Sequence, residues 1–223
     1  MKRLIKTNYL ALLLTVLVFS SCQGQTKRNH STSARAALIG GGCDGCELMY
    51  IGMPKQIKAI DTSAGWTEKG QKLLISGTVF KSDGKTPAPE VIIYYWQTDS
   101  QGYYSTRKGM DKRTLRHGHI RGWVKTDHQG RYAIYTIRPA TYPDHSEPAH
   151  IHTSIKEPNL DTEYYIDEFI FDDDPLLNAK KRKSLENRGG SGILKTSLSG
   201  NLQIAKHDLI LGLHIPNYPV LPH

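Results

Sequence analysis

From residue 72 onward the chain is a succession of short runs rich in β-branched and aromatic residues, each followed by turn-forming residues. The first run, residues 73–80, ends at Ser82-Asp83-Gly84-Lys85, where Asp-Gly marks the centre of a turn. Further runs follow at residues 91–96, 132–137, 150–152, 164–171, 202–204 and 208–213. Many short strands with almost no helical periodicity predict an all-β fold, and specifically an antiparallel β-sandwich.

One strand and one helix stand out within this pattern. Residues 91–96 are continuously apolar or aromatic, as expected of a strand that is buried on both faces. Asp174-Pro175 provides an N-cap acid and a first-turn proline before a run of helix formers that extends to Arg188. Gly189-Gly190 ends that run, so the sequence predicts one short helix near the C-terminal part of the chain.

The first 21 residues have the pattern of a signal peptide. Lys2, Arg3 and Lys6 form a positive region, and the apolar stretch that follows is shorter than the ~18 residues of a transmembrane helix. Ser20-Ser21-Cys22 resembles the lipobox of bacterial lipoproteins, in which the cysteine is lipidated. We therefore expect an exported chain anchored to a membrane by a lipid on Cys22, at the periplasmic face or the cell surface.

The expected organisation has four parts. They are a lipoprotein-type signal peptide (1–21), a flexible tether (22–42), an irregular segment with a cysteine pair (43–71) and the β-sandwich (72–223). The formal charge of +8 includes the three cations of the signal peptide, and Lys180 to Lys183 form one basic cluster in the predicted helix. This cluster has no interleaved aromatic residues, so it is better explained as a solvated helix face than as a nucleic-acid site. We expect no nucleic-acid partner, and the sequence is compatible with an oligomer.

Cys43 and Cys46 are the only cysteines besides Cys22. Their spacing is compatible with a redox pair, half of a zinc site or a small structural disulfide. The chain has no second Cys-x-x-Cys to complete a zinc site and no βαβ pattern around this one. In an oxidising compartment, a disulfide that tightens a glycine-rich loop is the favoured interpretation.

A metal site is indicated by Pro148-Ala149-His150-Ile151-His152. Side chains alternate along a strand, so both imidazoles project to one face and could bind one ion, although a packed or solvated pair has the same pattern. Tyr142 precedes His150 by eight residues across a turn-rich stretch, and Tyr104 follows another apolar run. Two phenolates and two neutral imidazoles form a donor set that suits ferric iron (Fe3+) better than zinc.

A series of motifs covering residues 72 to 215 resembles the intradiol ring-cleavage dioxygenases, the catechol and protocatechuate 3,4-dioxygenase group. The motifs occur in one order: Trp96-Gln97, Gly102-x-Tyr104, Thr126-Asp127-x-x-Gly130-x-Tyr132, Thr136-Ile137-Arg138-Pro139-x-x-Tyr142-Pro143, Pro148-Ala149-His150-Ile151-His152 and Phe171-x-x-Asp174-Pro175. The ordered combination is far more specific than any single motif.

The resemblance implies a β-sandwich that holds a mononuclear non-haem ferric ion. Its implied ligands are Tyr104 as the axial tyrosine, Tyr142 as the equatorial one, His150 and His152. Tyr103, Tyr94 or Tyr95 could replace Tyr104, because strand alternation decides which phenol points inward.

The implied reaction opens a catechol-type ring between its two hydroxylated carbons, with O2 as the oxidant and a muconate-type dicarboxylate as the product. Ferric iron is a strong Lewis acid that binds the catechol dianion through both oxygens. The phenolate of Tyr104, leaving the metal as substrate enters, is the expected base for one catechol proton. No organic cofactor or external reductant is implied.

Two residues depart from the family pattern. Glu147 stands where the family has an arginine, and Glu168 where it has a substrate-facing glutamine. A carboxylate at about 4 Å would repel a catecholate by about 1 to 4 kcal/mol, depending on screening. The candidates for a compensating cation are Arg116, His117, His119, Arg121 and Arg138.

Among these candidates we predict Arg121 as the catalytic residue that binds the substrate. The loop from Arg116 to Arg121 is the densest basic cluster, and an exposed basic loop is the competing interpretation. Two rival functions follow from the departures: a metal-binding sandwich of the same family without dioxygenase activity, and a surface binding module that uses the fold only as a scaffold.

Overall fold

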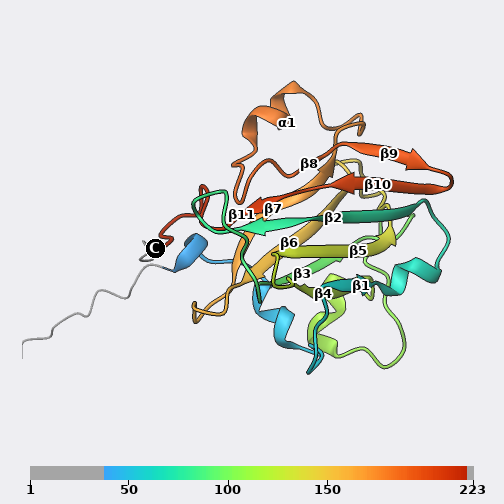
Figure 1. Cartoon of the computed structure of the whole chain (residues 1–223). Coiled ribbons are helices and arrows are strands. Elements are labelled where there is room, and N and C mark those ends of the chain that lie inside the picture. Colours follow the sequence, from blue (N-terminus) through green and yellow to red (C-terminus); the bar gives the residue numbers. More distant parts are fainter. Residues whose placement is uncertain (1–37, 220–223) are drawn as a thin grey trace, which may run out of the picture. The chain divides into compact units, whose positions relative to one another are not determined.

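The computed structural model describes residues 38–219, so the predicted signal peptide and Cys22 lie outside the described residues. The described strands, labelled in Figure 1, are β1 (Ile60–Thr62), β2 (Lys72–Phe80), β3 (Ile92–Gln97), β4 (Arg121–Lys125), β5 (Arg131–Ile137), β6 (His150–Lys156), β7 (Tyr164–Phe171), β8 (Ile193–Leu194), β9 (Thr196–Ser199), β10 (Leu202–Lys206) and β11 (Leu209–Ile210). The helical elements are the 3-10 helices η1 (Ile39–Gly41), η2 (Cys46–Tyr50), η3 (Ala64–Thr67) and η4 (Lys112–His117), and the α-helix α1 (Ala179–Ser184).

The strands form two sheets, and the predicted all-β sandwich is confirmed. One sheet has the order β1-β5-β2-β10-β9, with β11 also paired to β2, and the other has the order β4-β3-β6-β7-β8. The pairs β2–β5, β3–β4, β3–β6 and β6–β7 are antiparallel, as expected. The pairs β1–β5, β7–β8, β2–β10 and β2–β11 are parallel, so both sheets are mixed rather than purely antiparallel.

The hydrophobic core lies between the two sheets, and strand alternation explains its composition. In β2, Leu73, Ile75 and Val79 are buried, whereas the residues between them are only partly buried. They share one cluster with Ile151 of β6 and Phe169 of β7, which come from the opposite sheet. The inner face of each sheet therefore supplies every second residue to a common core.

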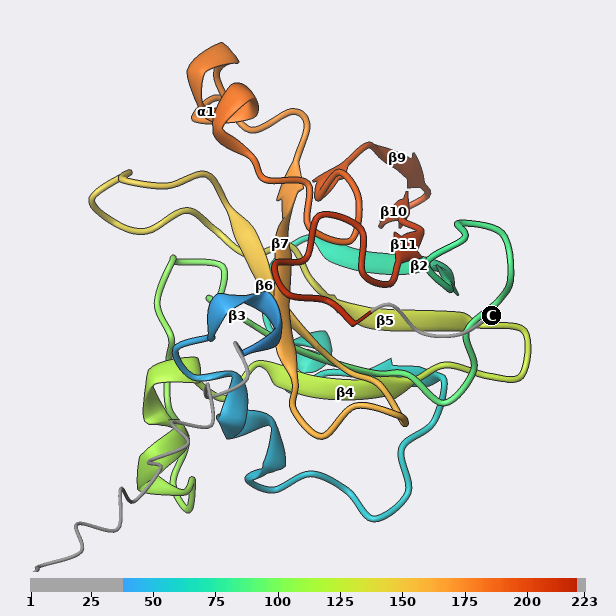
Figure 2. The same cartoon turned by 90° about the vertical axis from the view of Figure 1, so that its left-hand side faces the viewer.

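Strand β3 is buried on both faces, as its continuous apolar sequence predicts. Tyr95 points into the core, while Tyr94 and Trp96 point to the outer face and pack against Met49. Met49 belongs to the N-terminal segment, defined here as residues 38–58, whose blue ribbon lies against this sheet in Figure 2. The outer face of the sheet is thus covered by a segment that precedes the sandwich in sequence.

The predicted helix is only partly present. The structure has one short helix, α1, and Asn178 caps it by accepting a hydrogen bond from the Lys181 amide at 3.0 Å. The prediction that Asp174 is the N-cap is wrong, because its carboxylate accepts instead from the amides of Ala149 and Leu176. Within residues 38–219, no helix is long and apolar enough to cross a membrane.

Candidate metal centre and its pocket

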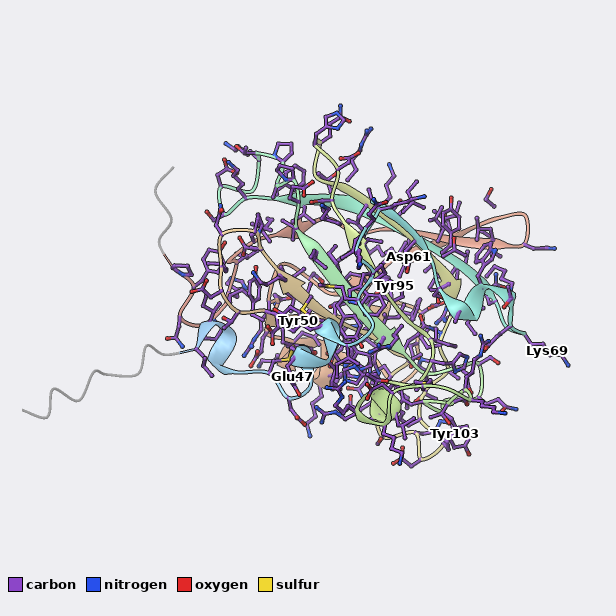
Figure 3. All side chains as sticks on the ribbon, turned by 90° about the horizontal axis from the view of Figure 1, so that it is seen from below. Glu47, Tyr50, Asp61, Lys69, Tyr95 and Tyr103 are labelled. Atoms are coloured by element: carbon purple, nitrogen blue, oxygen red, sulfur yellow. A yellow bond between two sulfur atoms is a disulfide. The ribbon has the colours of Figure 1, made fainter. Side chains whose placement is uncertain are left out.

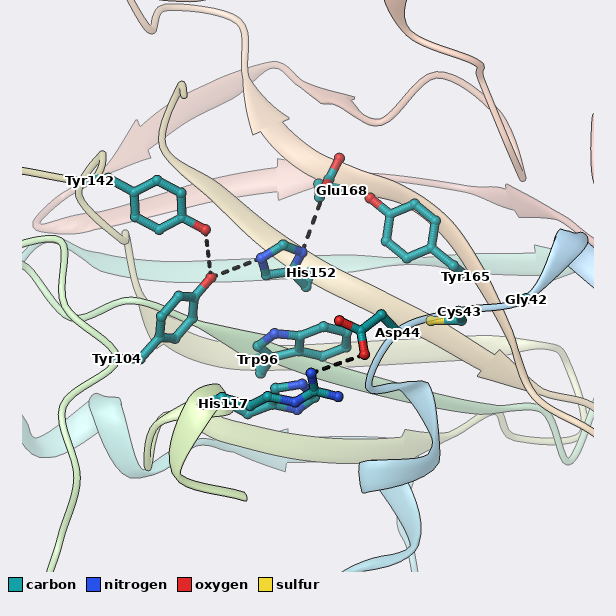
Figure 4. A pocket seen from close by; sticks show the side chains of 11 residues that line it. Gly42, Cys43, Asp44, Trp96, Tyr104, His117, Tyr142, His152, Tyr165 and Glu168 are labelled. Atoms are coloured by element: carbon teal, nitrogen blue, oxygen red, sulfur yellow. Dashed lines mark hydrogen bonds and ion pairs between the residues drawn. The ribbon is translucent and has the colours of Figure 1, made fainter. Parts of the chain in front are cut away.

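The four predicted ligands converge at the outer face of the second sheet. Figure 4 shows three of them, Tyr104, Tyr142 and His152. The hydroxyl oxygen of Tyr104 lies 2.9 Å from that of Tyr142 and 2.8 Å from His152 Nε2. His150 Nε2 lies 3.1 Å from both the Tyr142 hydroxyl oxygen and His152 Nε2. Two oxygens and two nitrogens therefore form a closed ring of neighbouring donor atoms.

Two loops are joined to bring the phenols together. Gly102 has a φ of +85°, and a Cβ atom on it would come within 2.1 Å of the Thr141 carbonyl oxygen. Only glycine permits this approach of the loop that carries Tyr104 to the loop that carries Tyr142. The Thr98 hydroxyl donates to the Ala140 carbonyl oxygen at 2.8 Å and links the same two loops.

The strand β6 and its neighbours orient the two imidazoles. His150 Nδ1 donates to the Pro148 carbonyl oxygen at 2.7 Å, so the lone pair of Nε2 faces the other donors. His152 Nδ1 lies 3.6 Å from a carboxylate oxygen of Glu168, and its Nε2 faces the ring of donors in the same way. The bond from the Ala149 amide to Asp174, at 2.9 Å, fixes the backbone just before His150. Carboxylates and carbonyls that hold the outer nitrogens are typical partners of metal-binding histidines.

The three alternative tyrosines point elsewhere. Tyr103 is 55% exposed and lies at the edge of the molecule in Figure 3. The Tyr95 hydroxyl donates to Asp61 at 2.5 Å, and both residues are labelled in the same figure. Tyr94 lies 2.8 Å from His117 Nδ1 and accepts a hydrogen bond from Arg121 at 3.0 Å. Of the four candidate phenols, only that of Tyr104 meets the histidines.

Burial disfavours the charged forms of three of the four donors, Tyr104, Tyr142 and His152. It raises the pKa of Tyr104, and the hydrogen bond that Tyr104 makes with Tyr142 adds to the effect. Burial likewise raises the pKa of Tyr142, while it lowers the pKa of His152 well below its usual range, assisted by the neighbouring His150. Two neutral phenols and a neutral imidazole in a buried site can be ionised or ligated only by a cation that replaces the lost hydration.

The donor set fits a trivalent ion such as ferric iron. Donors bound about 2.1 Å from one ion at right angles to each other lie about 3 Å apart. The observed separations of 2.8 to 3.1 Å match that spacing. Among the described residues, no group of three or more His, Cys, Asp and Glu side chains could hold a metal, so the phenol oxygens are required for a full site.

A cavity of about 410 Å³ opens onto the donor ring. It is lined by Gly42, Cys43, Asp44, Trp96, Tyr104, Arg116, His117, Tyr142, His152, Tyr165 and Glu168 (Figure 4). Pockets of this size hold small organic ligands. Trp96 stacks on His152, with ring centres 4.8 Å apart, and on His117 at 4.1 Å, so an aromatic wall runs outward from the donor ring.

A β-bulge in β7 places two further residues in this cavity. The register of β6 with β7 shifts between Ile151 and Thr153, so two residues of β7 oppose His152. Tyr165 and Glu168 would face opposite sides of a regular strand, because their spacing is odd. The bulge lets both line the cavity beside His152, and no sequence signal marks its position.

The N-terminal segment covers the outer end of the cavity. Cys43 and Cys46 are joined by a disulfide, and Cys43 and Asp44 are among the lining residues. Asp44 accepts from Arg116 at 3.0 Å, and Glu47 lies 3.5 Å from the same guanidinium. A loop remote in sequence therefore forms part of the wall of the pocket that the sandwich provides.

The structure places Arg121, predicted as catalytic, outside this cavity. Its guanidinium donates to the carbonyl oxygens of Leu48 and Ile51 and to the Tyr94 hydroxyl. It also lies 5.1 Å from the centre of the Trp123 ring. Arg121 begins strand β4, and its guanidinium contacts the N-terminal segment. These contacts join the segment to the sheet, and Arg121 is not among the residues that line the cavity.

The other candidate cations are similarly engaged. Arg138 pairs with Asp173 at 2.7 and 2.9 Å, and His119 Nε2 lies 2.5 Å from Glu68. Burial lowers the pKa of His117 to about 3, and the charges of Arg116 and Arg121 add to the effect. His117 lines the cavity as a neutral ring, so Arg116 is the only cationic side chain among the described lining residues.

The two departures from the family pattern have different environments. Glu147 pairs with Lys181 of α1 and is not part of the cavity lining. Glu168 lines the cavity, and its only basic neighbour within ion-pair distance in the described part of the chain is His152. The expected repulsion of a catecholate therefore concerns Glu168 and not Glu147.

Comparisons with known proteins agree with this architecture. A family model described as Dioxygenase matches residues 49–196. The catechol 1,2-dioxygenase of Acinetobacter baylyi is 30% identical over 95 residues, which cover 43% of this chain and 30% of that protein. The protocatechuate 3,4-dioxygenase beta chain of Burkholderia cepacia is 29% identical over 114 residues, which cover 48% of each chain. The chain thus matches half or less of the length of these curated relatives.

A solved structure shares the fold. The dioxygenase domain of a dioxygenase and carbohydrate-binding protein fusion from Streptomyces sp. SirexAA-E has a TM-score of 0.52 and 22% sequence identity. The match covers 70% of this chain and 87% of that chain. At this identity the likeness establishes the arrangement of the sheets.

Proposed function

Because the chain belongs to the intradiol dioxygenase family, we propose that it is a non-haem ferric dioxygenase that cleaves catechol-type rings between the two hydroxylated carbons. Both atoms of O2 enter the product, a muconate-type dicarboxylate. The observation that carries this proposal is the closed ring of four donors, Tyr104, Tyr142, His150 and His152, with neighbouring separations of 2.8 to 3.1 Å.

These four residues would hold the iron. When bound, ferric iron acts as a Lewis acid that favours the catechol dianion and makes its ring reactive toward O2. The hydrogen bond from His150 Nδ1 to Pro148 and the carboxylate beside His152 Nδ1 keep both Nε2 atoms available as ligands. The predicted ligands therefore have their supporting contacts as well as their mutual spacing.

The chain must also accept the catechol protons. Tyr104 is the proposed base, since its hydroxyl oxygen is within 2.9 Å of Tyr142 and 2.8 Å of His152 Nε2. A proton taken up at this oxygen remains within hydrogen-bond distance of those neighbours. Trp96 and the disulfide loop at Cys43 line the cavity in which the reacting ring would lie.

Spectroscopy and product analysis of the iron-loaded protein test this proposal. Tyrosinate bound to ferric iron should colour the protein, and anaerobic addition of catechol should shift the absorption band. Admission of O2 should then give a ring-opened dicarboxylate that contains both oxygen atoms of labelled O2. A coloured protein that binds neither catechol nor O2 would favour the metal-binding rival without dioxygenase activity, and a protein that never becomes coloured would contradict the iron site.

We also propose that the protein is exported and held at a membrane by a lipid on Cys22. The support is the lipobox-like Ser20-Ser21-Cys22 and the disulfide between Cys43 and Cys46, since structural disulfides persist in oxidising compartments. Mass spectrometry of the mature N-terminus should find an acylated cysteine, and Cys22→Ser should release the protein from the membrane fraction. An unprocessed N-terminus would overturn this proposal.

A further inference from the structure

We infer that the pocket selects catechols whose side chain carries a protonated amine and disfavours catechols with a carboxylate side chain. This inference rests on the proposed function, because it names the substrate class of the same site. It follows from the charges that line the cavity, from their pairing and from the aromatic wall.

The side chains that line the cavity carry more negative than positive charge. The charged side chains that line the cavity within the described residues are Asp44, Arg116 and Glu168. Arg116 already lies 3.0 Å from Asp44 and 3.5 Å from Glu47, so two carboxylates compensate its charge. An anionic side chain on a substrate would have to displace one of them to find a cation.

Glu168 lines the cavity next to His152. Its basic neighbour is His152, 3.6 Å away, and an imidazole that binds a metal is neutral. The Tyr165 hydroxyl, which lines the same cavity, donates a hydrogen bond to Glu168. Within residues 38–219, Glu168 is thus a carboxylate without a cationic partner, beside the donor ring and facing the cavity.

A cationic side chain on a substrate would meet aromatic rings in the wall of the cavity. Trp96, Tyr104 and Tyr165 present aromatic rings to the cavity. An ammonium group is attracted by the faces of such rings as well as by a carboxylate, whereas a carboxylate is attracted by neither. The other carboxylate of interest, Glu147, is paired with Lys181 and does not line the cavity.

Three catechols with matched substituents at one ring position test the inference. The side chains are aminoethyl, propyl and carboxymethyl, so that charge changes from positive through zero to negative at similar size. The dissociation constant of each is measured anaerobically on the iron-loaded full chain by the shift of the visible absorption band. We expect the aminoethyl compound to bind at least about tenfold more tightly than the carboxymethyl one at low salt, with the propyl compound between them. The difference should shrink as the salt concentration rises.

Two charge-neutralising variants locate the origin of the preference. Glu168→Gln should reduce it to about threefold or less, while Glu147→Gln, the same change outside the cavity, should leave it unchanged. Iron per chain is measured for each variant, so that an effect on metal retention is separated from one on selectivity. Equal affinities for the three compounds in the unmodified protein would overturn the inference.

A different experimental result would contradict the proposed function. If none of the three compounds shifts the band or yields a ring-opened product, the chain is not a catechol dioxygenase. If the propyl compound is bound and cleaved but the carboxymethyl one is preferred, the function stands and the inferred substrate class is wrong.

Discussion

In the sheet β4-β3-β6-β7-β8, neighbouring residues of one strand point to opposite faces and have different roles. On the inner face, Ile151 of β6 and Phe169 of β7 are fully buried in the core between the sheets. On the outer face, His152 of β6 lies next to Tyr104 and the rest of the donor ring. Because side chains alternate along a strand, adjacent residues contribute either to stability or to the donor ring. Substitutions on the two faces should therefore affect these two properties separately.

The largest effect on stability is expected on the inner face. Phe169→Ala should lower the free energy of unfolding by about 3 to 5 kcal/mol, because it removes a fully buried aromatic ring from a packed core. Urea denaturation followed by tryptophan fluorescence measures this change, and Phe169→Leu, which keeps most of the apolar volume, should lose clearly less. A loss below about 1 kcal/mol in the alanine variant would mean that this face does not dominate stability.

The next effect concerns the outer face and should leave the fold intact. His152→Ala or Tyr142→Phe should reduce iron retention by at least about tenfold, because each removes one of four donors. Iron per chain after dialysis is the measurement, and the urea midpoint of the iron-free protein should change little. His128→Ala, an exposed histidine in a turn, is the matched control and should retain iron. Normal iron content in the Tyr142 and His152 variants would refute the ligand assignment.

Arg121 and Arg116 are both predicted candidates for substrate binding, but their surroundings in the structure differ. Arg121→Ala should cost about 2 kcal/mol of stability, since its guanidinium donates to the carbonyls of Leu48 and Ile51 in a partly buried position. Arg116→Ala should cost less than about 1 kcal/mol, because its carboxylate partners are exposed. Thermal or urea unfolding measures both.

The two arginines should also differ in catechol affinity. Arg121→Ala should leave the dissociation constant for an uncharged catechol within about twofold of the original, because Arg121 does not line the cavity. A larger loss of catechol affinity in this variant, without loss of stability, would restore the interpretation of Arg121 as a substrate-binding residue.

The sequence predicts the parts of the molecule that follow local rules. Alternation in residues 73–80 and the aromatic run at 91–96 correspond to β2 and β3, and the spacing of His150 and His152 places both on one face. Strand β4 was missed, because its basic start at Arg121 resembles the end of a polar loop.

The features that escaped prediction depend on contacts between distant residues. The bulge opposite His152 brings Tyr165 and Glu168 to one face, which regular alternation forbids. Asp174 has the local sequence of a helix cap, but one of its oxygens accepts from the Leu176 amide in a turn, the other accepts from the distant Ala149 amide, and the helix begins only at Ala179. Arg121 finds its acceptors in the N-terminal segment, 70 and 73 residues away along the chain. No local pattern encodes such pairs, and of these features the bulge determines part of the pocket wall.

A buried histidine on the inner side gives a test by pH. His207 packs its ring against Phe169 at 4.6 Å between ring centres, and burial lowers its pKa to about 4, with Asp208 opposing the shift. The folded protein therefore holds this imidazole neutral at pH values where the unfolded chain, with an ordinary pKa of about 6.5, binds a proton. Unfolding then takes up a proton, so stability is lost as the pH falls from about 6.5 toward 4.

This loss should amount to about 2 kcal/mol by about pH 5 and vanish near pH 7.5. The measurement is the difference in unfolding free energy between the unmodified protein and His207→Gln across that range, in which the titration of the other groups cancels. The variant should become relatively more stable as the pH falls, because it has no imidazole to protonate. A difference that stays constant with pH would show that His207 binds a proton as readily in the folded protein as in the unfolded chain, and the contrast between a dry inner face and a donor-lined outer face would then fail at this position.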